Sequence, residues 1–178
     1  SNGRVLAGMG VGWLKEEFEA LGVPFRDRGR RLDEYIKALR CLWTEDAPTF
    51  KGEFVNFESV YCRPKPAQKN VPIIIGGHSK LAARRAGRLA DGYFPARSAP
   101  EDLIKEAKQA AAEIDRSPEE IEITASVPID LADLAHYANL GVTRVLLPVT
   151  TVTGLDSGIR DVSDVLGWKE NIERYMDV

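Results

Sequence analysis

A short apolar run, two glycines and an amphipathic segment constrain the fold of this chain more than any other stretch. Residues 71–75 are continuously apolar and rich in β-branched side chains, which is typical of a strand buried on both faces of a parallel sheet. Gly76 and Gly77 end this strand, and a helical pattern follows over residues 81–90. A second strand begins at residues 93–94. The stretch therefore predicts a βαβ unit.

The turn between this strand and its helix, Gly76-Gly77-His78-Ser79, is the first candidate site. Residues without a Cβ allow a ligand to approach the backbone, and the N–H groups at a helix start attract anions. Ser79 can cap the helix, because its hydroxyl can accept one of those N–H groups. We therefore expect a turn with free N–H groups that can hold a phosphate. The alternative is a plain strand-to-helix turn, in which the glycines only satisfy backbone geometry.

The composition limits the classes of function that the chain can have. It has 178 residues, a net charge of −3 and 44% hydrophobic residues, which suit one soluble globular domain. This balance does not favour binding to nucleic acid or to a membrane surface, and no apolar run could span a bilayer. Cys41 and Cys62 are too few and too distant for a zinc site or a disulfide framework. We expect reduced thiols, no metal site and a cytoplasmic location.

Helical and extended patterns alternate along most of the chain, which predicts a parallel sheet. Strands are expected at residues 5–9, 71–75, 93–94, 121–129 and 145–149. Helices are expected at residues 27–43 with Asp27 as cap, 81–90, 100–115 with Ile114 inward, 131–140 before a capping Gly141, and 161–176. Residues 44–68 interrupt this rhythm and contain a candidate hairpin, residues 49–50 with 54–55, so we expect a surface insertion there. The charges along residues 28–37 are interpreted as a solvated helix face.

Two architectures remain open on this pattern, a doubly wound sheet and a (β/α)₈ barrel. A complete barrel needs about 250 residues, so this chain is shorter by about three βα units. The glycine-rich tip at the end of the first strand, Gly8-Met9-Gly10-Val11-Gly12, has a GxGxG pattern that is weak evidence for a dinucleotide fingerprint. It lacks the GxGxxG spacing, and we expect no helix to follow it at once.

A series of short motifs, each weak alone, connects the chain to a family. In chain order they are Gly10-Val11-Gly12-Trp13, Glu17-Phe18, Leu21-Gly22-Val23-Pro24-Phe25, Arg28-Gly29-Arg30, Asp33-Glu34, Leu42-Trp43-Thr44, Phe50-Lys51-Gly52, Pro64-Lys65-Pro66, Ile75-Gly76-Gly77 with Ser79, Ala90-Asp91-Gly92, and Ala138-Asn139-Leu140-Gly141-Val142 before Arg144-Val145-Leu146-Leu147. By the order and spacing of these motifs, the chain resembles the C-terminal part of the bacterial luciferase-like monooxygenase family, and especially its deazaflavin-dependent oxidoreductases.

The resemblance implies an α/β fold, a partial TIM-type (β/α)₈ barrel made of the last five βα units. The domain would occupy residues 3–178, with the surface insertion at residues 44–68. The first three units of the barrel would be absent. A fragment of an ordinary enzyme is expected over a naturally short protein.

The resemblance also implies a cofactor, FMN or the deazaflavin coenzyme F420, bound at the C-terminal ends of the strands. Its phosphate would lie on Gly76, Gly77, His78 and Ser79. The tip with Gly10 and Gly12 would line the cofactor or substrate cavity. Trp13 would form part of the substrate cavity or pack elsewhere.

The implied reaction is hydride transfer to or from the cofactor ring, or reaction of reduced flavin with dioxygen, on a small-molecule substrate. A general acid or base would come partly from the absent units, so no catalytic residue is assigned. The competing hypothesis is a non-catalytic binding or assembly module of the same fold. Because five units cannot close a barrel, the first and last strands would each have an unpaired edge, and we expect a homodimer.

Overall fold

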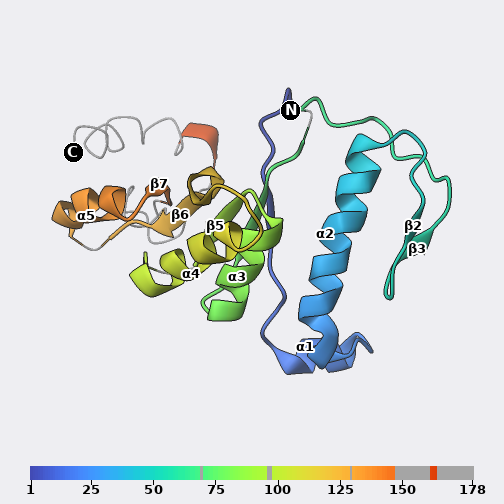
Figure 1. Cartoon of the computed structure of the whole chain (residues 1–178), viewed down its shortest axis with the longest axis horizontal. Helices are drawn as coiled ribbons and strands as arrows, with labels where there is room; N and C mark the ends of the chain where they lie inside the picture. The colour runs from blue at the N-terminus through green and yellow to red at the C-terminus, as the bar shows by residue number, and fades with distance from the viewer. Residues whose placement is uncertain (69, 96–97, 129, 147–160, 164–178) are drawn as a thin grey trace.

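A five-stranded parallel sheet with helices packed along it forms the body of the protein in the computed structural model (Figure 1). The structure describes residues 1–68, 70–95, 98–128, 130–146 and 161–163. The strands, in their order across the sheet, are β1 Ala7–Met9, β4 Ile73–Gly76, β5 Gly92–Phe94, β6 Glu122–Ser126 and β7 Val142–Leu146. Every neighbouring pair is parallel, which confirms the predicted parallel sheet.

The connections between these strands carry the helices. They are α1 Lys15–Ala20, α2 Arg28–Thr44, α3 Lys80–Leu89, α4 Glu101–Ala112 and α5 Leu134–Asn139, with short 3₁₀ helices η1 Phe25–Asp27, η2 Pro118–Glu120 and η3 Leu131–Asp133. The strand order across the sheet follows the order in the chain. A doubly wound sheet reverses its order at a switch point, whereas consecutive units of a barrel do not. The fold is therefore α/β, and it corresponds to part of a TIM-type barrel.

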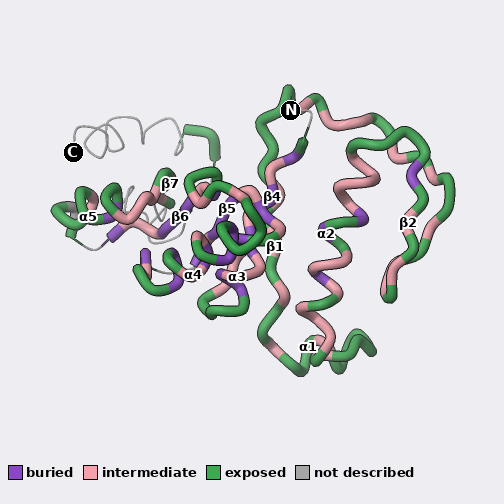
Figure 2. Tube along the Cα trace, viewed as in Figure 1, coloured by how far each residue is buried: buried purple, intermediate pink, exposed green. Residues whose placement is uncertain are grey.

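Strand β4 lies at the centre of the core. Ile73 and Ile75 are 0% and 1% exposed and pack in one cluster with small residues of α3 and α4, among them Ala86 and Ala107. Figure 2 shows the buried residues gathered around these elements, whereas α1 is mostly exposed. Ile74, which points to the other face, is only half-buried, so the prediction of a strand buried on both faces is wrong. A closed barrel fills its interior with side chains from all of its strands, and five strands leave this face partly open.

An ion pair fastens α2 to the sheet at the N-terminal ends of the strands. Arg40 donates from Nη2 to the Asp91 carboxylate at 2.9 Å and to the Leu89 carbonyl at 3.1 Å. The same Asp91 oxygen accepts the backbone N–H of Ile73 at 2.8 Å. One carboxylate thus joins α2, the start of β4 and the turn before β5.

The expected insertion contains an antiparallel hairpin, β2 Phe50–Lys51 and β3 Asn56–Phe57, held by Glu34 of α2. The Glu34 carboxylate accepts the backbone N–H groups of residues 53, 54 and 55 at 2.8, 2.7 and 2.6 Å. Partial desolvation raises the pKa of this carboxyl, but the three N–H donors outweigh it, and its pKa is lowered from the ordinary value. The predicted pairing of residues 49–50 with 54–55 is wrong, because Glu34 takes the N–H groups that such a strand would need.

The insertion ends beside the start of the first strand. Gln68 Nε2 donates to the Val5 carbonyl oxygen at 2.9 Å, just before β1. Within the described ranges β1 itself pairs only with β4, so its other edge is open. The first strand is also shorter than the predicted residues 5–9.

Several predicted helix ends differ from the structure. Helix α1 was not expected so soon after the glycine-rich tip. Asp27 precedes α2 but does not cap it, because its carboxylate pairs with Arg30 at 2.9 Å. Helix α4 ends before Ile114, whose side chain is 46% exposed rather than inward. The predicted cap at Gly141 is confirmed, since its φ of +84° suits glycine and its N–H bonds the Ala138 carbonyl at 2.9 Å.

The last two strands also differ in extent from the prediction. Strand β6 is shorter than residues 121–129, and β7 begins at Val142 rather than at residue 145. The end of the expected last strand, residues 147–149, lies outside the described residues, as does most of the expected helix at residues 161–176. Within the described ranges, no helix combines the length and the apolar character needed to cross a bilayer.

Candidate functional site

The glycine turn and the glycine-rich tip meet at the C-terminal ends of β1, β4 and β5. Met9 of β1 is in register with Ile75 of β4. A Cβ on Gly76 would lie 3.7 Å from the Met9 carbonyl oxygen and 3.9 Å from the Phe94 carbonyl oxygen. The turn therefore lies between the ends of two neighbouring strands. In barrels of this type, ligand sites form at this edge.

Gly77 holds the turn in a shape that other residues cannot adopt without strain. Its φ is +145°, and a Cβ there would stand 2.8 Å from the Cβ of Ala82. Its N–H donates to the Phe94 carbonyl at 3.0 Å. The prediction that this N–H is free is therefore wrong. Its carbonyl accepts the hydroxyl of Tyr93 at 2.8 Å. Burial, and secondarily the charge of Asp102, raises the pKa of Tyr93 to about 12, which keeps this hydroxyl a donor.

The start of α3 offers the donors that an anion needs. Ser79 Oγ accepts the Ala82 N–H at 3.2 Å, which confirms the predicted cap. The backbone N–H groups of residues 78–81 have no acceptor among the residues that the structure describes. His78 donates from Nδ1 to the Pro95 carbonyl at 2.9 Å, so Nε2 is its remaining ring nitrogen. The turn thus follows β4, which is buried on one face, and the donors at residues 78–81 after it are exposed.

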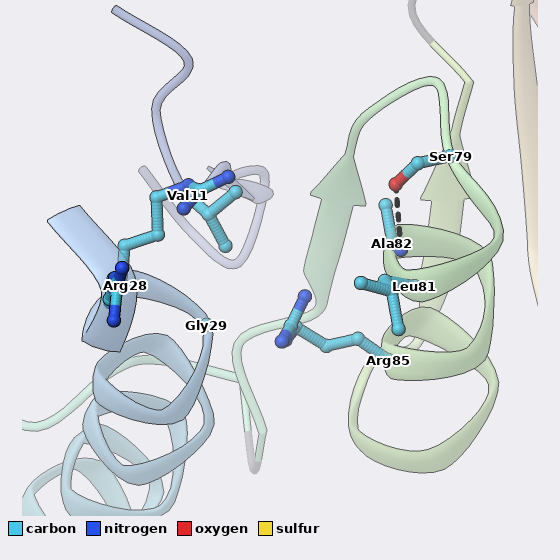
Figure 3. A pocket seen from close by; sticks show the side chains of 8 residues that line it. Val11, Arg28, Gly29, Ser79, Leu81, Ala82 and Arg85 are labelled. Atoms are coloured by element: carbon cyan, nitrogen blue, oxygen red, sulfur yellow. Dashed lines mark hydrogen bonds between the residues drawn. The ribbon is translucent and has the colours of Figure 1, made fainter. Parts of the chain in front are cut away.

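A cavity of about 170 Å³ opens beside this turn, between the starts of α2 and α3 (Figure 3). Val11 from the glycine-rich tip and Ser79 from the turn both line it, so two motifs predicted separately share one cavity. Arg26, Arg28 and Arg85 also line it. None of its lining residues is acidic, which makes the cavity cationic.

Two of these arginines are held in place, Arg85 by a residue far away in the sequence and Arg28 by one close to it. Arg85 extends from α3 toward α2 (Figure 3), where its Nη2 lies 2.6 Å from the place of a Cβ on Gly29 and its Nε pairs with the Asp33 carboxylate. Arg28 lies 3.7 Å from the centre of the Phe25 ring and donates to the Phe25 carbonyl at 2.9 Å. The Arg28 Nε atom is buried and has no hydrogen-bond partner among the described residues.

Sequence reasoning missed the three arginines, because it interpreted Arg28 as part of a solvated face at residues 28–37 and gave Arg26 and Arg85 no role in binding. The sequence did contain a signal for an anion site, in the charges of the first helical turns. Helices α2 and α3 have no acidic residue in the first turn and begin with Arg28 and Lys80, whereas α1 and α4 each have two acidic residues in the first turn. The helix dipole disfavours cations at an N-terminus, so two adjacent helices that reverse the usual charge order indicate a site for anions.

The remaining predicted residues lie near the cavity without lining it. The Trp13 side chain is 82% exposed. Gly10 is exposed and faces open space, and Gly12 lies against the Phe18 ring. Their roles in a cofactor or substrate cavity stay predictions. Among the described residues, no group of three His, Cys, Asp or Glu side chains could hold a metal ion.

Comparison with known proteins gives matches over most of the chain. The family model described as luciferase-like monooxygenase matches residues 1–150. An uncharacterised protein of Mycobacterium tuberculosis is 36% identical over 154 residues, which are 82% of this chain and 53% of that protein. An FMNH2-dependent dimethylsulfone monooxygenase of Pseudomonas putida is 41% identical over 98 residues, which are 53% of this chain and 27% of the enzyme. The chain thus spans about half the length of the first relative, and less of the second.

A solved structure confirms the fold. The F420-dependent secondary alcohol dehydrogenase, in complex with an F420-acetone adduct, superimposes with a TM-score of 0.60 at 23% identity. The superposition covers 70% of this chain and 40% of the dehydrogenase. At this level of identity, the likeness concerns the arrangement of strands and helices.

Proposed function

Since the chain belongs to the luciferase-like monooxygenase family, we propose that the whole protein is an oxidoreductase that uses a reduced deazaflavin or FMN cofactor. The turn after β4 carries this proposal. It combines a glycine with no room for a Cβ, a serine cap and N–H groups at residues 78–81 without an acceptor among the described residues. One curated relative is named as FMNH2-dependent and one structural neighbour as F420-dependent, and the proposal includes both cofactors.

The residues of the turn fit a phosphate group of such a cofactor. The free backbone donors at the start of α3 would bind its oxygens, with the positive end of the helix dipole behind them. Ser79 can donate its hydroxyl hydrogen to the phosphate while its oxygen still accepts the Ala82 N–H. Because Nδ1 of His78 is engaged by Pro95, only Nε2 can reach a ligand. Tyr93 keeps the Gly77 carbonyl in place beneath them.

The bound cofactor would supply hydride transfer or the reaction of reduced flavin with dioxygen, and the substrate would be a small molecule. The protein's part at this edge of the sheet is to bind and orient. Residues 78–81 would fix the phosphate end of the cofactor. We assign no general acid or base among the described residues.

A pair of matched ligands tests the proposal on the full-length protein. FMN and riboflavin differ only in the phosphate, so we expect riboflavin to bind at least about tenfold more weakly, as measured by flavin fluorescence. For the deazaflavin, F420 is compared with the fragment that lacks both the phosphate and the chain beyond it. Equal affinities in both comparisons would refute a phosphate site at the turn. The competing hypothesis, a non-catalytic module of the same fold, predicts that no cofactor binds at all.

A further inference from the structure

The cationic cavity beside the turn has more positive charge than the fold explains. Arg85 has a structural partner in Asp33, but Arg26 has no hydrogen-bond or ion-pair partner among the described residues. Among the described residues, Arg28 has polar and ring interactions with Phe25 alone, and its buried Nε lacks an acceptor. A buried donor without an acceptor destabilises a fold, which applies to the Arg28 Nε, whereas the exposed Arg26 has donors that no described residue uses.

The three arginines lie where the backbone also attracts anions. Arg26 and Arg28 lie at the start of α2, and Arg85 extends its guanidinium from the middle of α3 to the same place, beside Gly29. The dipole of α2 already makes the potential positive there. Arg26, Arg28 and Arg85 line the cavity, and no acidic residue does. The nearby carboxylates have partners of their own, since Asp33 pairs with Arg85 and Asp27 with Arg30. An incoming oxyanion would satisfy the free N–H groups and offset the repulsion, and arginine binds carboxylates and phosphates through two parallel hydrogen bonds.

We propose that Arg26, Arg28 and Arg85 form a second oxyanion subsite next to the phosphate turn, which binds an anionic group that the ligand carries beyond its phosphate. The inference rests on the proposed function, because it takes the ligand to be anchored at residues 78–81. Ser79 lines both places, so the two subsites are adjacent. FMN ends at its phosphate, whereas F420 continues beyond it into a chain with carboxylates. The subsite would therefore favour F420 over FMN.

Single arginine variants of the full-length protein test the subsite by affinity rather than by activity. Arg26→Gln removes an exposed side chain without a recorded structural partner, so its folding should be unaffected. Arg28→Gln removes the second guanidinium, and Arg88→Gln serves as the control, because Arg88 is an exposed arginine of α3 outside the cavity. Dissociation constants for F420 and FMN are measured by fluorescence at low and high salt.

We expect Arg26→Gln and Arg28→Gln each to weaken F420 binding about tenfold while FMN binding changes less than about twofold. The Arg88→Gln control should change neither. Added salt should weaken F420 binding more than FMN binding, because the subsite is partly open to solvent. Equal losses for both cofactors, or no loss for either, would overturn the proposal.

A further measurement distinguishes failure of the proposed function from failure of the oxyanion subsite. If wild type binds neither cofactor, the proposed function fails. The subsite is then tested by measuring the melting temperature with the dipeptide γ-glutamylglutamate and with inorganic phosphate. A rise in melting temperature that is absent from the Arg26→Gln/Arg28→Gln double variant would support an oxyanion subsite for another ligand, such as an anionic substrate. The same rise in both proteins, or none in either, would refute the subsite.

Discussion

The replacement of Gly77 by alanine and by aspartate separates a structural from a functional role of the turn. Both side chains meet the same obstacles, a φ of +145° and a Cβ position 2.8 Å from the Cβ of Ala82. Backbone strain of this kind costs about 1–3 kcal/mol, and both variants should lose that much free energy of unfolding. The aspartate lies ahead of the N-terminus of α3, where a carboxylate gains at most about 0.3–1 kcal/mol. Gly77→Asp should therefore be no less stable than Gly77→Ala.

The two variants should differ in the opposite direction in their affinity for a phosphate-bearing cofactor, where Gly77→Asp is the weaker binder. Two unit charges about 4 Å apart repel by about 4 kcal/mol at an effective dielectric constant of about 20. A third of that, about 1.4 kcal/mol, weakens binding tenfold. We therefore expect Gly77→Asp to bind FMN or F420 at least about tenfold more weakly than Gly77→Ala does.

The two quantities are measured on the same preparations. Urea denaturation gives the free energy of unfolding, and fluorescence titration gives the dissociation constant at a temperature where both variants are folded. If the alanine and aspartate variants bind the cofactor equally well, the phosphate does not lie near Gly77, and the glycine serves the backbone alone. If aspartate is the less stable variant, the helix-dipole argument is wrong.

Four further outcomes follow from the structure. Tyr93→Phe should lower the free energy of unfolding by about 0.5–1.5 kcal/mol at neutral pH by leaving the Gly77 carbonyl without its donor. Because the pKa of Tyr93 rises from 10.0 to about 12 on folding, wild type should lose stability between those pH values, and the gap to the variant should narrow in pH-dependent urea titrations. Glu34→Gln should speed hydrogen exchange at the backbone N–H groups of residues 53–55, because it weakens their hydrogen bonds to the carboxylate. Since folding lowers the pKa of Glu34, wild type should lose this protection only as the pH falls below 4.5. Gly87→Ala should cost about 1–3 kcal/mol in urea denaturation, because its Cβ would overlap a backbone oxygen of α4, whereas Gly8→Ala, which meets open space, is the control. The open edges that β1 and β7 have among the described residues predict a homodimer of this chain, and a monodisperse monomer in light scattering at high concentration would contradict that.

Features that depend on neighbouring residues were predictable from the sequence. The Ser79 cap and the Gly141 cap each depend on groups within three residues, and both are present. The strand at residues 71–75 and its glycine turn follow from a local apolar run. The parallel sheet follows from the alternation of such units, because each unit determines its own helix and strand.

Features that depend on distant partners were not predictable. Phe50 pairs with Phe57 rather than with the expected residues 54–55, because Glu34 binds the N–H groups of residues 53–55. Glu34 is 19 to 21 positions away from them in the sequence. Arg85 borders the cavity because Asp33, 52 positions away, pairs with it. The half-buried face of Ile74 depends on how many strands the barrel contains, which no local pattern encodes.

The Arg40–Asp91 pair lies at the opposite end of the strands from the glycine turn. In barrels of this kind, that end stabilises the fold while the other end binds ligands. On the proposed function, substitutions around Asp91 would therefore be constrained by folding alone, and substitutions around Ser79 by the ligand as well. An engineer could select stabilising changes at one end and new specificities at the other, with little interference between the two searches. The same separation would let natural descendants of this barrel change substrate without first rebuilding the scaffold.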